Sequence, residues 1–69
     1  MIHLSPRQHE IARLVVQGKS NKGIASELKL SVRSVEEYVL RAAKRLPGDG
    51  KPRVKIIRWW FSVNYERAA

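Results

Sequence analysis

The chain has 69 residues, of which 43% are hydrophobic, so it is long enough for one small globular domain with a thin core and too short for two. Fourteen Lys and Arg against six Asp and Glu give a formal net charge of +8, which favours nucleic acid as partner over an acidic protein surface, an anionic membrane or a merely solvated basic surface. The absence of cysteine excludes disulfides, thiolate metal sites and cysteine nucleophiles, and fits a reducing cytoplasm.

The first predicted helix runs from Pro6 to about Gln17. Ser5 can cap its start, and Gln8 stands where a capping box requires Glu or Gln. Gly18 follows as a residue that commonly ends a helix. The apolar side chains that share one face at helical spacing are Ile11, Leu14 and Val15.

A second helix is expected over residues 21–28, capped by Ser20, and a third over residues 32–46, capped by Ser31. The tight turn between them begins at Lys29. A short helix, a tight turn and a longer capped helix have the spacing of a helix-turn-helix. The inward-facing positions are Ile24, Ala25 and Leu28 in the second helix, and Val35, Val39, Ala42 and Leu46 in the third, with Tyr38 flanking them.

Residues 47–51 have the sequence PGDGK, which ends the third helix and makes a flexible connection. A fourth element is expected over residues 52–66, and a helix is favoured there, although the β-branched and aromatic content also permits a strand. As a helix, its apolar face would consist of Val54, Ile57 and Phe61, with Ile56, Trp60 and Val63 adjoining.

These elements predict an all-α fold, a compact helix-turn-helix domain of about four helices in which a tri-helical core is followed by a C-terminal helix. Residues 1–69 are expected to form a single domain, with the core at residues 4–46, the linker at residues 47–51 and the C-terminal helix at residues 52–66. We expect no separate sensor domain.

Three segments carry a resemblance to a known family. They are Leu4-Ser5-Pro6-Arg7 with Glu10, the sequence GKSNKGIA at residues 18–25, and the sequence LSVRSVE at residues 30–36. Their order and spacing resemble the LuxR-type (GerE-type) DNA-binding domain. Residues 53–60 are more loosely similar to the dimer-forming fourth helix of that family, and residues 31–46 also resemble the last part of bacterial sigma-factor region 4.

The resemblance implies that the third helix enters the major groove of duplex DNA, while the first two helices brace it and touch the DNA backbone. With Val35 in the core, a step of about 100° per residue places Arg41, Lys44 and four further side chains on the outer half of the third helix. The four that we expect to face the bases are Arg33, Glu36, Glu37 and Leu40.

Phosphate contacts need only positive charge and hydrogen-bond donors near helix starts. Ser20, Asn21 and Lys22 open the second helix, and the resemblance places their counterparts against the DNA backbone. The residues that could extend this surface are Lys19, Ser34, Arg41 and Lys44. For any single cation, simple solubility is an equal alternative.

Glu36 and Glu37 depart from the family, which more often has Lys or a neutral donor at these positions. Phosphates repel carboxylates, although Glu can accept a hydrogen bond from the N4 amine of cytosine. Three interpretations stay open: base readout by at least one Glu, a solvated face with intrahelical pairs such as Glu37 with Arg41, and a contact with protein.

Two further departures bear on stability. Gly23 replaces an acidic residue of the family, and Gly in a helix costs about 1 kcal/mol relative to Ala. Lys29 stands where the turn usually has Gly, so it is strained if that turn requires positive φ. We expect the helix-turn-helix to form with reduced local stability.

Trp59, Trp60 and Phe61 are consecutive aromatic residues, which cannot all face one small core from a helix. One interpretation is a core aromatic beside a half-buried Trp; another is a homodimer contact; a third is contact with a partner protein or with bases. The residues proposed for a dimer or partner interface are Ile56, Trp59, Trp60 and Val63.

Catalytic and metal-binding patterns are missing. His3 and His9 have no Cys, Asp or Glu cluster at metal spacing, no His-Asp arrangement activates a serine, and no Gly-rich phosphate loop is present. We therefore expect no enzyme, no metal and no cofactor. The longest apolar run, Ile56 to Phe61, is short and interrupted by Arg58, so we expect neither export nor a membrane partner.

The sequence thus predicts a small transcriptional regulator of a bacterium, phage or mobile element that binds double-stranded DNA as a homodimer in the cytoplasm. Its own concentration or a partner would control it. The alternative is a protein-interaction module that uses the same fold to bind RNA polymerase or a larger regulator, as an anti-activator or co-regulator.

Overall fold

The computed structural model describes the backbone of residues 3–68 and the side chains of residues 3–63. It contains α1 (Pro6–Val16), α2 (Asn21–Leu28), α3 (Val32–Lys44) and α4 (Pro52–Ala68), with no strand in the part described. The predicted all-α fold is confirmed, and the fourth element is a helix rather than a strand. The third helix ends at Lys44 with Arg45 as its C-cap, before the expected Leu46.

Serine residues begin the first three helices, as the sequence predicts. Ser5, Ser20 and Ser31 each have extended backbone and accept a hydrogen bond from the backbone N–H three residues later. At α1 the predicted capping box is complete in both directions. The Ser5 N–H donates to Gln8 Oε1 at 2.9 Å, and the Gln8 N–H donates to Ser5 Oγ at 3.1 Å. These caps satisfy donors that have no partner within the helix, so the starts are set by local sequence.

The ends of α1 and α2 both use left-handed backbone. Gly18 has φ +86°, its N–H donates to the Val15 carbonyl at 3.0 Å, and the Lys19 N–H reaches the Leu14 carbonyl at 3.2 Å. Lys29 adopts φ 57° and ψ 45°, and the next N–H, of Leu30, donates to the Ala25 carbonyl at 2.9 Å. The turn before α3 therefore requires positive φ at a residue that carries a Cβ.

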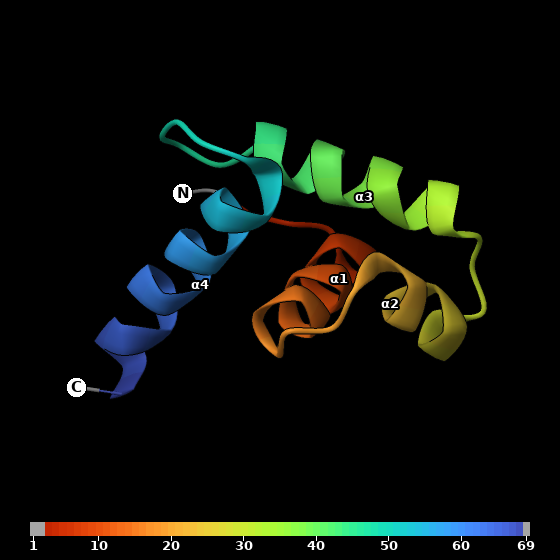
Figure 1. Ribbon diagram of the computed structural model, residues 1–69. Helices are drawn as coiled ribbons and strands as arrows, with labels where there is room; N and C mark the ends of the chain where they lie inside the picture. Colours follow the sequence, from red (N-terminus) through yellow and green to blue (C-terminus); the bar gives the residue numbers. More distant parts are fainter. Residues whose placement is uncertain (1–2, 69) are drawn as a thin grey trace.

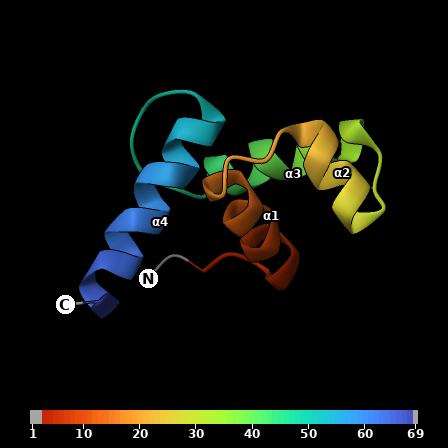
Figure 2. The same ribbon diagram turned by 60° about the horizontal axis from the view of Figure 1, so that its bottom comes forward.

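The core forms where the inner faces of α1, α2 and α3 meet, and α4 closes it by packing against α1 and α3. Figures 1 and 2 show α2 and α4 on opposite sides of α1, with the far half of α4 extending beyond the other helices. The fully buried side chains at this junction include Ile11, Leu14, Ile24, Val35 and Ile56. Leu46 is also buried although it follows the end of α3, whereas Leu28 is half-buried.

The orientation of α4 differs from the expected one. Val54, Ile57 and Phe61 were expected to form its apolar packing face, but they are 46%, 37% and 60% exposed. Ile56 is instead completely buried, and both Trp side chains pack against the core from the same side. Apolar side chains cover a broad arc of this helix, with Lys55, Arg58 and Ser62 on the remaining side, so periodicity alone does not distinguish the buried part of the arc from the exposed part.

The segment between α3 and α4 is held by a side chain of α4. Arg58 Nη1 donates a hydrogen bond to the Asp49 carbonyl at 3.1 Å. This hydrogen bond from a charged donor restricts the motion of residues 47–51, which the sequence predicts to be a flexible connection. In the described part of the chain, no helix is long and apolar enough to cross a membrane.

The left-handed conformation of Lys29 generates a stability prediction. Lys29→Gly should raise the free energy of unfolding by about 1 kcal/mol, because glycine has no Cβ to oppose positive φ. Urea unfolding followed by circular dichroism measures the change. Lys29→Ala removes the same charge but keeps the Cβ, so it should give no such gain; equal stabilisation by both variants would contradict the explanation.

Candidate nucleic-acid interface

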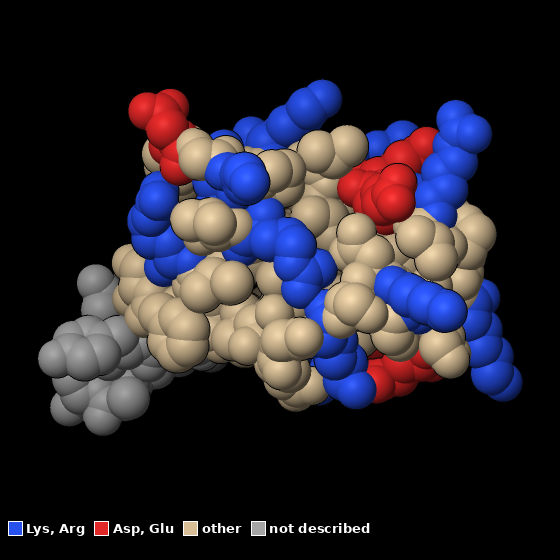
Figure 3. All heavy atoms as spheres, viewed as in Figure 1, with Lys and Arg blue, Asp and Glu red and all other residues tan. Residues whose placement is uncertain are grey.

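The outer face of α3 carries the side chains that the sequence places toward the bases. Arg33, Glu36, Glu37 and Leu40 are exposed, while Val35, Val39, Ala42 and Ala43 are buried on the opposite face. Arg41 and Lys44 are also exposed on the outer half. Figure 3 shows both signs of charge over α3, with a red patch among blue side chains. This face therefore offers a mixture of cations, carboxylates and one large apolar group.

The two carboxylates on this face differ in their partners. Glu37 Oε1 lies 3.8 Å from Arg33 Nε in an i,i+4 pair. The intrahelical pair considered from the sequence joined Glu37 to Arg41, so the pairing runs in the opposite direction along the helix. Glu36 has no hydrogen bond or ion pair within the described residues. Glu36 is therefore the uncompensated acid of the outer face.

The start of α2 contains residues proposed for phosphate contact, and several of them already have intramolecular partners. Ser20 Oγ accepts the Gly23 N–H at 3.1 Å, and Asn21 Oδ1 accepts from Arg53 at 3.0 Å. Lys19 Nζ pairs with Glu27 Oε1 at 3.0 Å. Lys22 is exposed and keeps its charge available to solvent. Ser34, at the start of α3, accepts a hydrogen bond from Ser31 Oγ at 2.9 Å and belongs to that cap.

Arg53 is a residue whose role the sequence reasoning missed. From the first turn of α4 it reaches the start of α2, where Nη1 donates to Asn21 Oδ1 at 3.0 Å and Nη2 donates to the Lys19 carbonyl at 2.6 Å. The side chain is partly buried, so these charge-assisted hydrogen bonds are shielded from water. Nothing in the periodicity of residues 52–66 identifies this arginine, because its acceptors lie more than 30 positions away in sequence.

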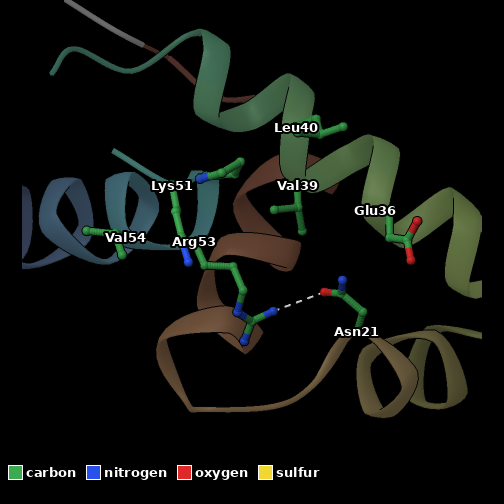
Figure 4. Close-up of a pocket in the computed structure, with 8 residues that line it drawn as sticks. Asn21, Glu36, Val39, Leu40, Lys51, Arg53 and Val54 are labelled. Atoms are coloured by element: carbon green, nitrogen blue, oxygen red, sulfur yellow. Dashed lines mark hydrogen bonds between the residues drawn. The ribbon is translucent and has the colours of Figure 1, made fainter. Parts of the chain in front are cut away.

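An open groove of about 430 Å³ lies between α3 and the start of α4. Asn21, Glu36, Val39 and Leu40 line it together with residues 51–54. Figure 4 shows Glu36 and Leu40 on α3, Lys51 and Val54 on the other side, and the hydrogen bond from Arg53 to Asn21. The groove thus borders the outer face of α3, and two of the proposed base-facing side chains form its wall.

The residues proposed for an interface on α4 share one face of the helix, and most of that face packs against the core instead of being open to a partner. Ile56 is fully buried and presents nothing to a partner, which corrects its assignment. Trp59 and Trp60 are half-buried against the core, and the Trp60 ring lies 5.0 Å from the exposed His9 ring. Val63 is 37% exposed. A second apolar surface of α4, on another side from Val63, is exposed and consists of Val54, Ile57 and Phe61.

The geometry defines the class of the protein. A short helix, a left-handed turn at Lys29 and a longer helix capped by Ser31 form a helix-turn-helix whose second helix has an exposed outer face. The profile of the bacterial regulatory proteins of the luxR family matches residues 3–59. The chain belongs to the luxR family of bacterial regulatory proteins, as the sequence resemblance indicated.

Curated relatives agree with this assignment. The chain is 52% identical over 63 residues to a probable transcriptional regulator ycf29 of Pyropia yezoensis, an alignment that covers 91% of this chain and 27% of that protein. It is 50% identical over 40 residues to the response regulator Rre1 of Synechocystis sp., which covers 58% of this chain and 17% of the regulator. It is 34% identical over 53 residues to the spore germination protein GerE of Bacillus subtilis, which covers 77% and 72%.

The matched region is small relative to most of these proteins. The chain spans 17 to 27% of the length of the ycf29 and Rre1 regulators. No solved structure matches the chain significantly.

The link from α4 to α2 generates a prediction. Arg53→Ala should lower the free energy of unfolding by about 2 kcal/mol, because it removes partly buried hydrogen bonds from a charged donor and leaves the Lys19 carbonyl without its partner. Urea unfolding measures the loss. The matched control is Arg58→Ala, which removes an exposed guanidinium-to-carbonyl hydrogen bond from the same helix and should cost less than about 1 kcal/mol. Equal losses would contradict the role assigned to Arg53.

Proposed function

We propose that the chain binds duplex DNA to regulate transcription, with α3 in the major groove and the start of α2 against the sugar-phosphate backbone. The exposed outer face of α3 carries this proposal, because it stands clear of the core over the whole length of a capped helix. The family to which the chain belongs regulates transcription, and the net charge of +8 suits a polyanionic ligand.

Backbone attachment would come from cations and donors at the start of α2 and in the last turn of α3. The exposed cations that could bind phosphate are Lys22 at the start of α2 and Arg41 and Lys44 on α3. Asn21 offers its amide N–H₂, since Arg53 occupies only its oxygen. Such contacts position the protein on the duplex and supply affinity that depends on salt.

A titration of fluorescent duplexes tests the proposal. Binding should weaken steeply between about 50 and about 200 mM salt, because phosphate contacts release counterions. Lys22→Ala should reduce the slope of log affinity against log salt by about 1 on all sequences alike. Lys29→Ala is the matched control, since Lys29 follows the opposite end of α2, about 12 Å away, and should leave the slope unchanged. Failure of the native chain to bind any duplex at low salt would rule out the proposed function.

A second copy of the chain is the partner that we propose for the exposed side of α4. Val54, Ile57 and Phe61 recur at helical spacing, and in a soluble helix such a stripe normally has a partner. A dimer would place two recognition helices about one turn of DNA apart. It would act in the cytoplasm and be controlled by its own concentration or by a partner.

The dimer proposal predicts the effect of a charge at its centre. Ile57→Glu should shift the chain toward monomer and weaken binding to a two-half-site duplex, because the carboxylate would be buried without a partner. Sedimentation velocity over a concentration series measures this. Ser62→Glu adds the same charge on another side of the helix and should leave the association unchanged. A native chain that stays monomeric at all concentrations would contradict the proposal.

Contact with RNA polymerase or a larger regulator is the second candidate function. The uncompensated carboxylate of Glu36 beside an open, largely apolar groove favours it, since such a wall suits a peptide with apolar and cationic side chains. The titration distinguishes the two candidates, because a chain that acts only through protein partners would bind duplex DNA weakly and without any preferred sequence.

A further inference from the structure

Glu36 and Leu40 stand one helical turn apart on the outer face of α3. Both side chains are exposed, and Leu40 is 48% exposed although it is a large apolar residue. At an i,i+4 spacing the two lie on the same side of the helix, about 6 Å apart along the helix axis. They also share the wall of the groove in Figure 4. A duplex that meets this part of α3 would meet both side chains together.

Of the two neighbouring carboxylates on α3, Glu36 is the better candidate for contact with a base. Glu37 lies 3.8 Å from the Arg33 guanidinium, so part of its charge is compensated within the helix. Glu36 has no such partner in the part of the chain that the structure describes. A carboxylate that approaches DNA unpaired is repelled by the phosphates, and only a donor on a base edge offsets that repulsion.

The chemistry of the major groove restricts which base can supply the donor. An ionised carboxylate only accepts hydrogen bonds. Cytosine presents its N4 amine without an acceptor on the same base, whereas adenine presents its amine beside the acceptor N7 and therefore suits an amide better than a carboxylate. Guanine presents acceptors only on this side, and thymine presents an acceptor and a methyl group. Cytosine is the base that matches Glu36.

Leu40 has no polar atom, so its readout must come from apolar contact. The C5-methyl group of thymine is the apolar group that the major groove offers. Base pairs are stacked about 3.4 Å apart, so a separation of about 6 Å along α3 lets Leu40 reach a base pair within about two steps of the one that Glu36 contacts.

We propose that Glu36 and Leu40 are specificity-determining residues: Glu36 selects a C·G pair through the cytosine amine, and Leu40 selects a T·A pair within about two steps of it through the thymine methyl group. The assignment rests on the proposed binding of duplex DNA. Glu36 would also lower the affinity for every site that lacks the amine, because the carboxylate then faces phosphates without compensation. The same residue would thus raise specificity and reduce non-specific binding.

Unbiased selection of bound duplexes with the full chain tests this assignment. The native chain should enrich half-sites that contain C and T within about two steps of each other. Glu36→Gln should lose the preference for cytosine by about tenfold and turn toward adenine, since an amide pairs with adenine N6 and N7. Leu40→Ala should lose the thymine preference alone. Glu10→Gln is the matched control, because it makes the same chemical change in an exposed ion pair on α1, away from the outer face of α3, and should keep both preferences.

A second readout separates recognition from folding. On duplexes without the selected site, Glu36→Gln should bind more tightly than the native chain, because it removes one repelled charge; a variant damaged in folding would bind less tightly. Retention of the cytosine preference by Glu36→Gln, or its loss in Glu10→Gln, would overturn the assignment and leave the proposed function intact. A native chain that binds duplexes without any base preference would also overturn it. Absence of all duplex binding at low salt would instead contradict the proposed function itself.

Discussion

Val35, Val39 and Ala42 on the inner face of α3 pack into the core that α1, α2 and α4 share. A helix of this length can bury only one stripe, so packing this stripe forces the opposite stripe into solvent. The side chains offered to a partner are therefore fixed by the side chains that are buried. Glu36 and Leu40 are presented together because neither belongs to the stripe that α3 must bury.

The start of α2 is the place where the other helices are tied to this arrangement. Ser20 caps the helix, Lys19 in the preceding loop offers its carbonyl, and Arg53 from α4 binds that carbonyl and the Asn21 side chain. Three residues that we propose for phosphate contact thus also hold the helices together. An interaction that moved α4 would act directly on the start of α2, since the Arg53 guanidinium joins the starts of these two helices.

Charge is divided between two tasks on this small surface. The general excess of cations attracts a polyanion whatever its sequence. The outer face of α3 instead mixes signs, with Arg33 and Glu37 paired and Glu36 left alone. A face of this kind contributes little attraction of its own and is suited to discriminate between ligands that the rest of the surface holds.

Local sequence determined where the first three helices begin, because each start depends on a serine oxygen and a backbone N–H three residues away. It also determined where α1 ends, because Gly18 adopts the positive φ of that end without strain. It also determined the outward face of α3, whose apolar stripe is narrow and unambiguous. Two features were decided only by tertiary structure. The face that α4 buries was decided by its packing against α1 and α3, since apolar side chains cover a broad arc of that helix. The role of Arg53 depended on acceptors more than 30 residues away. No local pattern contains information of either kind.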